Sequence, residues 1–173
     1  MKHQIILLGK DITSVYHGIK EFGPDHVHLL CTNETKEVAA PLFPLLPDGI
    51  RRTLYRTEPY DGEHVRNVCR KIHQTYPSAE FAYNLSEGTK VMAFAAFTIA
   101  KEYSVPAFYL SQLGELIRLD SFEKYPMKSQ LDNKEILGLS GNILTEYQDA
   151  KHLSDTDVQA SGLIKQFIEQ YPK

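Results

Sequence analysis

The residues best suited to chemistry lie in one short polar stretch, Asn-Leu-Ser-Glu-Gly-Thr-Lys, at positions 84–90. Within it Gly88 permits close backbone approach, and Ser86 and Thr89 supply hydroxyl groups. Lys90 begins an apolar helical pattern, where free N–H groups attract anions and a lysine is unfavourable unless an anion is bound. The stretch therefore predicts a phosphate-binding turn. The structural alternative is that Ser86 caps the helix and Lys90 extends into solvent.

A second polar stretch, at positions 9–14, follows the apolar run 4–8. It is neither the GxGxxG pattern nor the GxxxxGK[ST] phosphate loop, so ordinary dinucleotide binding and nucleotide triphosphate hydrolysis both lose support. Taken alone, Asp11, Thr13 and Ser14 are typical helix-capping residues. Both stretches come directly after predicted strands, and in an open parallel sheet ligands bind at that edge.

The elements that position these stretches alternate along the first 120 residues. The continuous apolar run 4–8 predicts a strand buried on both faces, and further strands are predicted at 26–31, 51–56, 80–84 and 105–110, with 115–120 as a hairpin partner for the last. Helical spacing predicts helices near 15–22, 62–76 and 89–103, and a proline-rich loop is expected before 47. The pattern indicates α/β architecture: a Rossmann-like, mostly parallel sheet flanked by helices.

The character of the sequence changes near residue 125. We expect a Rossmann-like domain over 1–125 and a short C-terminal helical appendage over 126–173, with helices near 133–139 and 155–170. The apolar run 91–100 is too short to span a bilayer and is expected to be a buried helix. No signal peptide is recognisable, and we expect a cytoplasmic protein.

Composition narrows the possible partners. The chain has 173 residues, with 19 Lys and Arg against 22 Asp and Glu and a net charge of −3. This balance argues against duplex nucleic acid as a partner but allows a small anion in a local pocket. Cys31 and Cys69 are far apart and show no zinc-binding spacing, so we expect reduced, buried thiols, no metal and no cofactor.

The strand, the Asn-Leu-Ser/Thr-x-Gly-Thr-Lys loop and the hydrophobic helix together resemble the CARF domain of type III CRISPR systems. The resemblance covers roughly residues 4–120 and is sharpest over 83–96. It implies a homodimer that binds a cyclic oligoadenylate across its two-fold axis, with cyclic tetra-adenylate the commoner ring. Glu87 departs from the family pattern, which usually has a small residue there. The implied ligand-binding residues are Gly9, Lys10, Asp11, Ile12, Thr13, Ser14, Thr32, Asn33, Asn84, Leu85, Ser86, Glu87, Gly88, Thr89 and Lys90, and Gln112 and Glu115 lie at further strand ends suited to flanking the adenines.

Three functions remain open from the sequence. The preferred one is a CARF sensor that controls an effector output located elsewhere, with membrane contact expected only through an anchor outside this chain. The second is a stand-alone, metal-independent ring nuclease, for which Lys90 and Ser14 are the catalytic candidates. The third is an unrelated Rossmann-like enzyme acting on a nucleotide or sugar phosphate.

Overall fold

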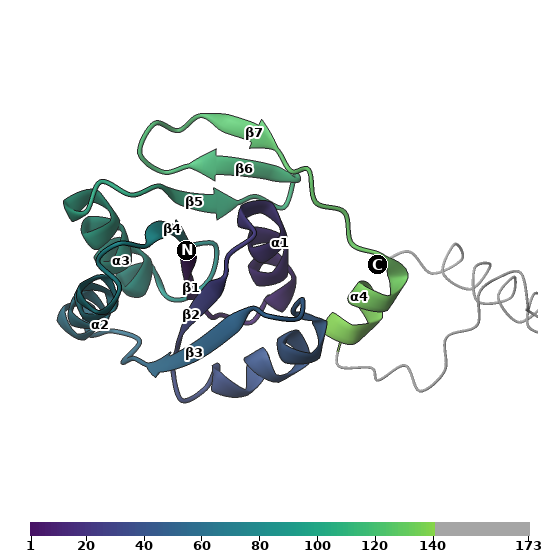
Figure 1. The fold of residues 1–173 in the computed structure, drawn as a ribbon, viewed down its shortest axis with the longest axis horizontal. Coiled ribbons are helices and arrows are strands. Elements are labelled where there is room, and N and C mark those ends of the chain that lie inside the picture. The colour runs from purple at the N-terminus through teal and green to yellow at the C-terminus, as the bar shows by residue number, and fades with distance from the viewer. Residues whose placement is uncertain (141–173) are drawn as a thin grey trace, which may run out of the picture. The chain divides into compact units, whose positions relative to one another are not determined.

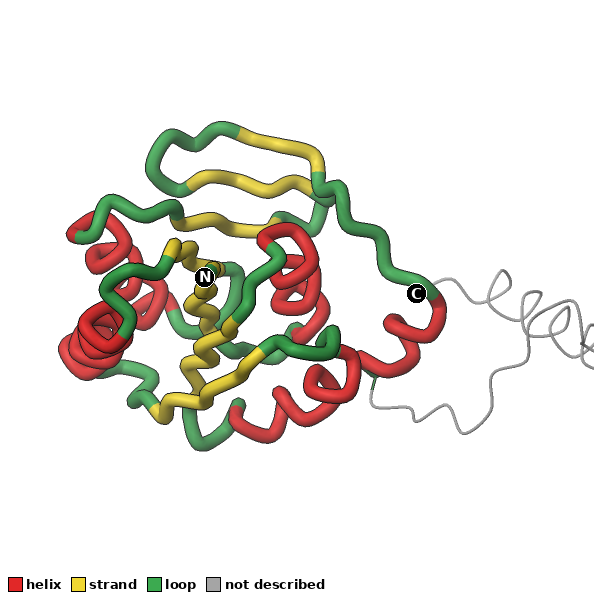
Figure 2. Tube along the Cα trace, in the orientation of Figure 1, coloured by secondary structure: helices red, strands yellow, loops and turns green. Residues whose placement is uncertain are grey.

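The computed structural model describes residues 1–140, which form one seven-stranded sheet between two layers of helices (Figure 1). The strand order is β3-β2-β1-β4-β5-β6-β7. The strands are β1 (Lys2–Leu7), β2 (His26–Cys31), β3 (Arg51–Arg56), β4 (Glu80–Asn84), β5 (Ala107–Leu110), β6 (Glu115–Arg118) and β7 (Lys124–Pro126). The helices are α1 (Ile12–Phe22), the 3-10 helix η1 (Lys36–Leu45), α2 (Gly62–Thr75), α3 (Lys90–Glu102) and α4 (Asn133–Leu139) (Figure 2).

The first five strands are parallel, and β6 and β7 extend the sheet as an antiparallel hairpin. The chain runs from β1 outward to β3 and then returns to place β4 on the other side of β1. This arrangement confirms the predicted Rossmann-like, mostly parallel sheet. The order of the strands reverses between β1 and β4.

Strand β1 shows why the sheet must be covered on both faces. Ile5 and Leu7 pack in the core cluster that α2 and α3 cover, whereas Ile6 and Leu8 pack in the cluster beneath α1, η1 and α4. All four side chains are fully buried. A strand with one face in water alternates apolar and polar residues, whereas a strand buried on both faces does not. This explains the continuous apolar run in the sequence.

The helices begin at side chains that accept backbone hydrogen bonds. Asp11 caps α1 by accepting from Thr13 N, and Asp61 caps α2 by accepting from His64 N. Thr89 caps α3 in the same way. The cap of α3 is therefore Thr89, three residues beyond the Ser86 that the sequence suggests.

Several boundaries differ from those predicted. The expected proline-rich loop contains η1, because Pro41 and Pro44 lack amide donors but have backbone angles that a 3-10 helix accepts. Strand β7 was not predicted, and it crosses the expected domain boundary at 125/126, which itself stays a prediction. Helix α4 was predicted, and Glu135 in it forms an ion pair with Lys20 of α1 at 2.8 Å. The helix expected at 155–170 lies outside the described residues.

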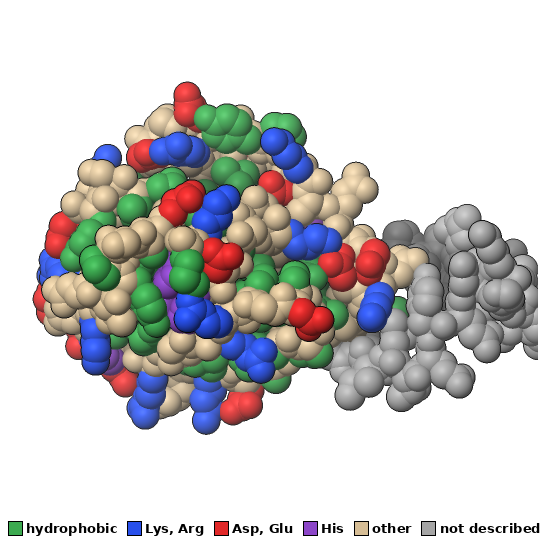
Figure 3. All heavy atoms as spheres, viewed as in Figure 1, with side chains coloured by type: hydrophobic (Ala, Val, Ile, Leu, Met, Phe, Trp, Pro, Cys, Tyr) green, Lys and Arg blue, Asp and Glu red, His purple; other side chains and the backbone are tan. Residues whose placement is uncertain are grey.

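The described surface carries both signs of charge. On the face drawn in Figure 3, lysine and arginine side chains are interspersed with aspartate and glutamate. Within residues 1–140, no helix is long and apolar enough to cross a membrane.

Candidate functional site

The two polar stretches singled out in the sequence meet at the reversal point of the sheet. The loop 9–11 leaves the carboxyl end of β1, and the loop 85–89 leaves the carboxyl end of the neighbouring β4. In open α/β sheets this reversal point opens the crevice in which ligands bind. The amide side chain of Asn84 ties the loops together, because Nδ2 donates to the carbonyl oxygen of Ser14 at 3.3 Å.

The first loop uses its polar side chains mainly to start α1. The Asp11 carboxylate accepts from Thr13 N at 2.9 Å, and the Ser14 hydroxyl donates to the Asp11 carbonyl at 3.0 Å. Thr13 is exposed, whereas the side chain of Ile12 is buried in the core, so Ile12 can offer a ligand only its backbone. Lys10 is exposed at the rim, and among residues 1–140 no ion-pair partner holds it.

The second loop is held rigid by a short chain of hydrogen bonds. The Asn84 side-chain oxygen accepts from both the amide of Ser86, at 3.1 Å, and its hydroxyl, at 2.6 Å. The Ser86 hydroxyl oxygen in turn accepts from Leu110 N on β5 at 2.9 Å. Asn84 and Ser86 therefore fix the conformation of the turn. Ser86 also connects the end of β4 to β5 through its hydrogen bond with Leu110.

Gly88 and Thr89 complete the turn. Gly88 has φ of +83°, and a Cβ at this position would lie 3.0 Å from the Cβ of Leu7. Only glycine combines that backbone angle with such a close approach to β1. The Thr89 hydroxyl donates to the carbonyl oxygen of Pro59 and accepts from Met92 N at 3.1 Å. Both residues thus present the start of α3 to the crevice.

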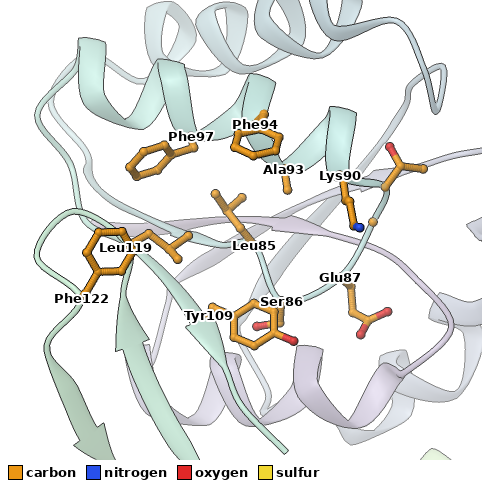
Figure 4. Close-up of a pocket in the computed structure, with 12 residues that line it drawn as sticks. Leu85, Ser86, Glu87, Lys90, Ala93, Phe94, Phe97, Tyr109, Leu119 and Phe122 are labelled. Carbon is orange, nitrogen blue, oxygen red and sulfur yellow. The ribbon is translucent and has the colours of Figure 1, made fainter.

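Lys90 is the first residue of α3 and is exposed. In Figure 4 its side chain extends from the helix toward the turn that carries Ser86 and Glu87. No hydrogen bond or ion pair engages its amine within the described part of the chain. A lysine in the first turn opposes the helix dipole, so an anion at this position would relieve that conflict.

Glu87 reaches from the second loop to the first and lines a cavity on each side. Its Oε2 accepts from Asp11 N at 3.3 Å, and its Oε1 lies 3.5 Å from the Ser14 hydroxyl. Gly9 leaves room for the carboxylate, because a Cβ on Gly9 would come within 1.9 Å of Oε2. Burial and the neighbouring Asp11 raise the pKa of Glu87, whereas the amides of Lys10 and Asp11 and the Ser14 hydroxyl act against that rise.

Glu87 lines two cavities, and a third lies beside its neighbour Ser14. The largest, about 470 Å³, is mostly apolar and lies between α3, the 85–90 turn and the β6–β7 connection (Figure 4). Its wall consists of Leu85, Ala93, Phe94, Phe97, Tyr109, Leu119 and Phe122, with Ser86, Glu87, Gly88, Thr89 and Lys90 at one end. A second, of about 370 Å³, lies against Lys10, Thr32, Tyr60 and the other side of Glu87. The third, of about 240 Å³, lies beside Ser14 and Gln112.

The remaining predicted residues fall into two groups. Thr32 and Gln112 line cavities next to the crevice. Thr32 is also buried, and its hydroxyl accepts from the amides that open the turn before η1. Asn33 is exposed and lines none of the three cavities, and Glu115 pairs with Lys124 at 3.1 Å.

The aromatic wall was not anticipated from the sequence. The apolar run 91–100 was expected to be buried, yet Phe94 is 72% exposed and Val91 also reaches solvent, while Met92, Ala96 and Ile99 are buried. Phe122, from the β6–β7 connection, is 74% exposed. A sequence signal did exist: Phe94 and Phe97 stand three residues apart, which places both on the same side of a helix.

Comparison with known proteins finds the same fold in several solved structures. No family model and no curated protein matches the sequence. Among solved structures, Can2 from Sulfobacillus thermosulfidooxidans in complex with cyclic tetra-adenylate superposes with a TM-score of 0.74 at 20% identity, over 98% of this chain and 50% of that one. A type III CRISPR defence DNA nuclease activated by cyclic oligoadenylate gives 0.69 at 21% identity, over 99% and 28%. Protein VC1899 from Vibrio cholerae gives 0.70 at 13% identity, over 81% and 39%.

The chain shares its fold with these CARF-domain proteins. A further CARF protein, Enterococcus italicus Csm6 bound to a cyclic hexa-adenylate analogue, superposes less closely, with a TM-score of 0.56. This chain spans half or less of the length of each of these proteins. The CARF fold confirms the architecture expected from the resemblance of the 83–96 segment.

Proposed function

We propose that this chain is a cytoplasmic CARF sensor that binds a cyclic oligoadenylate, with cyclic tetra-adenylate the first candidate, and controls an effector output. One observation carries the proposal: the loops that lead into the N-termini of α1 and α3 meet at the strand reversal point, and Lys10 and Lys90 line cavities on the two sides of Glu87. The fold shared with Can2, which was solved with cyclic tetra-adenylate, supports the same ligand class.

The crevice suits phosphate groups despite the net charge of −3. Helix N-termini carry partial positive charge, and each lysine adds a full charge at short range. Because such interactions act locally, the sum over the whole chain does not decide whether an anion binds. The aromatic side chains Phe94, Tyr109 and Phe122 offer flat apolar surfaces of the kind on which adenine rings stack.

A homodimer fits the same surface. Val91 and Phe94 are exposed on the outer side of α3, close to Lys90 at its start, and Phe122 is exposed nearby across the apolar cavity. A second copy facing this side would bury apolar side chains that one copy leaves in water. It would also bring two sets of lysines to one two-fold axis, which matches a ring with two equal halves.

A ring nuclease is the second candidate. Its observation is that Glu87, a carboxylate with a raised pKa, lies 3.5 Å from the Ser14 hydroxyl, so the two could act together on a bound ribose. Cleavage without metal requires a ribose 2′-hydroxyl to attack its own phosphorus, with loss of its proton and departure of the 5′-oxygen, giving a 2′,3′-cyclic phosphate. Lys90 could stabilise the developing negative charge, and Ser14 could orient the 2′-hydroxyl. The raised pKa of Glu87 would suit a proton-transfer group.

The deciding experiment mixes excess protein with cyclic tetra-adenylate in EDTA, separates the protein by gel filtration and identifies the nucleotide by mass. The sensor predicts that the intact ring elutes with a dimer. Lys90→Ala should abolish this co-elution, whereas Lys101→Ala, at the far end of the same helix, should leave it unchanged. Linear fragments ending in a cyclic phosphate would establish the ring nuclease instead.

Absence of any nucleotide from the protein peak would overturn tetra-adenylate as the ligand. Cyclic hexa-adenylate is then the next ring to test, in the same format. Failure of both rings, with a mononucleotide or sugar phosphate retained, would favour an unrelated Rossmann-like enzyme. Retention of the ring by Lys90→Ala would show that the ligand binds elsewhere.

A further inference from the structure

Three buried histidines gather at the end of the sheet opposite the phosphate crevice. His3 lies on β1, directly opposite His26 on β2, and His28 follows two residues later on the same face of β2. All three are almost fully buried. Each offers one nitrogen, and the three nitrogens lie within 4.8 Å of one another.

Neighbouring side chains fix the orientation of two of these rings. His26 Nε2 lies 2.9 Å from the Thr53 hydroxyl, and His28 Nδ1 lies 3.2 Å from the Tyr55 hydroxyl, both on β3. When each hydroxyl oxygen accepts the ring N–H, the other nitrogen of each ring keeps its lone pair. Metal-ligating histidines characteristically bond an outer acceptor in this way, which sets the tautomer.

The lone pairs that remain are poorly used by the protein itself. His26 Nδ1 is buried and has no hydrogen-bond partner in the described structure. His28 Nε2 lies 2.9 Å from His3 Nδ1, so one proton serves both nitrogens. A buried nitrogen left without a partner destabilises the fold, so this arrangement calls for an explanation.

We propose that His3, His26 and His28 bind a divalent transition-metal ion, with Zn²⁺ the first candidate, through one imidazole nitrogen each. Imidazole suits zinc, copper and nickel, and the cluster contains no carboxylate that would favour magnesium or calcium. With bonds of about 2.1 Å, tetrahedral coordination needs nitrogens about 3.4 Å apart. The His3–His28 pair must therefore open by about half an ångström, and His26 must move inward.

The surroundings suit a metal that stabilises structure. The ring of Tyr76 packs against all three imidazoles, with centroids 4.6–5.5 Å apart, and Phe81 packs against His3. Such an ion would cross-link β1 and β2 near the amino ends of these strands. The proposal does not rest on cyclic oligoadenylate binding, because that crevice lies at the other end of the strands.

The test uses the full chain without a histidine tag, dialysed against EDTA and then freed of chelator. Titration with ZnCl₂ in a calorimeter should show one ion per chain, and the melting temperature should rise with zinc concentration. Co²⁺ should give the visible absorption of tetrahedral coordination. His26→Gln and His28→Gln should each weaken binding at least tenfold, since even outer partners of metal ligands contribute ~10–100-fold. His64→Gln, on the surface of α2, should bind as the wild type does.

X-ray absorption of the zinc-loaded wild-type protein removes any dependence on variants that fail to fold. Three imidazole nitrogens in the coordination shell would support the site. An all-oxygen shell, a lack of stoichiometric uptake, or loss of binding in His64→Gln alone would overturn it. Unchanged binding in folded His26→Gln and His28→Gln would do the same.

Discussion

At the scale of single residues, Glu87 is the feature that most affects how this crevice could work. Its carboxylate accepts the amide of Asp11 at the start of α1 and lies beside Ser14. A phosphate oxygen bound at that helix terminus would use the same donor. Glu87 therefore acts as an internal anion, and a phosphate ligand has to displace it or tolerate its charge.

Replacing that carboxylate should strengthen ligand binding. In Glu87→Gln, the repulsion between a carboxylate and a nearby phosphate is removed, which is worth roughly 1 kcal/mol or more, so we expect about fivefold tighter binding of cyclic tetra-adenylate near neutral pH. In the wild type, the raised pKa means that Glu87 takes up a proton before an ordinary glutamate does as the pH falls. Wild-type affinity should thus rise on acidification, and the Gln variant should lose that dependence.

Calorimetric titrations at about pH 7.5 and about pH 5 would check this. Glu80→Gln, at the opposite end of β4, is the matched control and should keep the wild-type pH dependence. Weaker binding by Glu87→Gln would mean instead that the carboxylate contacts the ligand favourably, for example through a ribose hydroxyl.

At the scale of elements, the 84–90 turn is built before any ligand arrives. Ser86 joins Asn84 to the amide of Leu110, and Gly88 lets the turn pass against Leu7. A preformed turn loses little conformational entropy when a ligand binds, which favours affinity.

Two glycines with positive φ provide a test of that close approach. Gly88→Ala places a Cβ 3.0 Å from Leu7 Cβ at φ +83°, and we expect it to lower the free energy of unfolding by about 2–3 kcal/mol. Gly23→Ala, at φ +59° with no heavy atom within 4 Å, should lose only about 1 kcal/mol. Urea unfolding of both variants measures the difference in the free energy of unfolding. Equal decreases would show that Leu7 moves aside at no cost and that the close approach does not require glycine.

The elements also show how much of the fold could be predicted from the sequence. Strands β1, β2, β4 and β5 follow from short, largely apolar runs, because a parallel strand covered on both faces is mainly apolar. Strands β3 and β6 have exposed or half-buried side chains, and no such run marks them. The sequence did not predict η1 or β7. Two prolines made the η1 segment look like a loop, and β7 has only three residues, too few for a recognisable pattern. The two loops could be singled out from the sequence as candidate site segments. The Glu87–Asp11 contact could not, because it joins residues 76 apart and depends on the strand order. The histidine cluster depends likewise on the register of β1 and β2.

At the scale of the whole molecule, the proposed dimer can be tested through one exposed side chain. Phe94→Asp puts a charge on the outer side of α3, and because Phe94 is 72% exposed the fold should tolerate it. We expect a monomer by light scattering and a loss of cyclic tetra-adenylate binding. Ile136→Asp, a half-exposed position on α4, should stay dimeric. A wild-type chain that is monomeric both with and without ligand would exclude the dimer.

The stability of the whole fold should fall in acid. Burial lowers the pKa of His73 from 6.5 to about 4, and its Nε2 lies 2.9 Å from the buried Tyr83 hydroxyl. Between those values the unfolded chain binds the proton and the folded chain does not, so the free energy of unfolding decreases as the pH falls. The slope from this residue is at most roughly 1.4 kcal/mol per pH unit. Urea midpoints measured in EDTA should fall less steeply in His73→Gln than in His64→Gln.

The two edges of the sheet limit how copies of this chain can assemble. One edge is β3, whose outer positions include Arg51, Arg52 and Arg56; the other is β7, with Lys124 and Pro126. Cationic side chains repel a like edge, and proline withholds a ladder donor, so neither strand is a good template for another strand. Growth of the sheet from copy to copy is thereby discouraged. In the proposed dimer, association through helix faces would close after two copies and leave no free end for further addition.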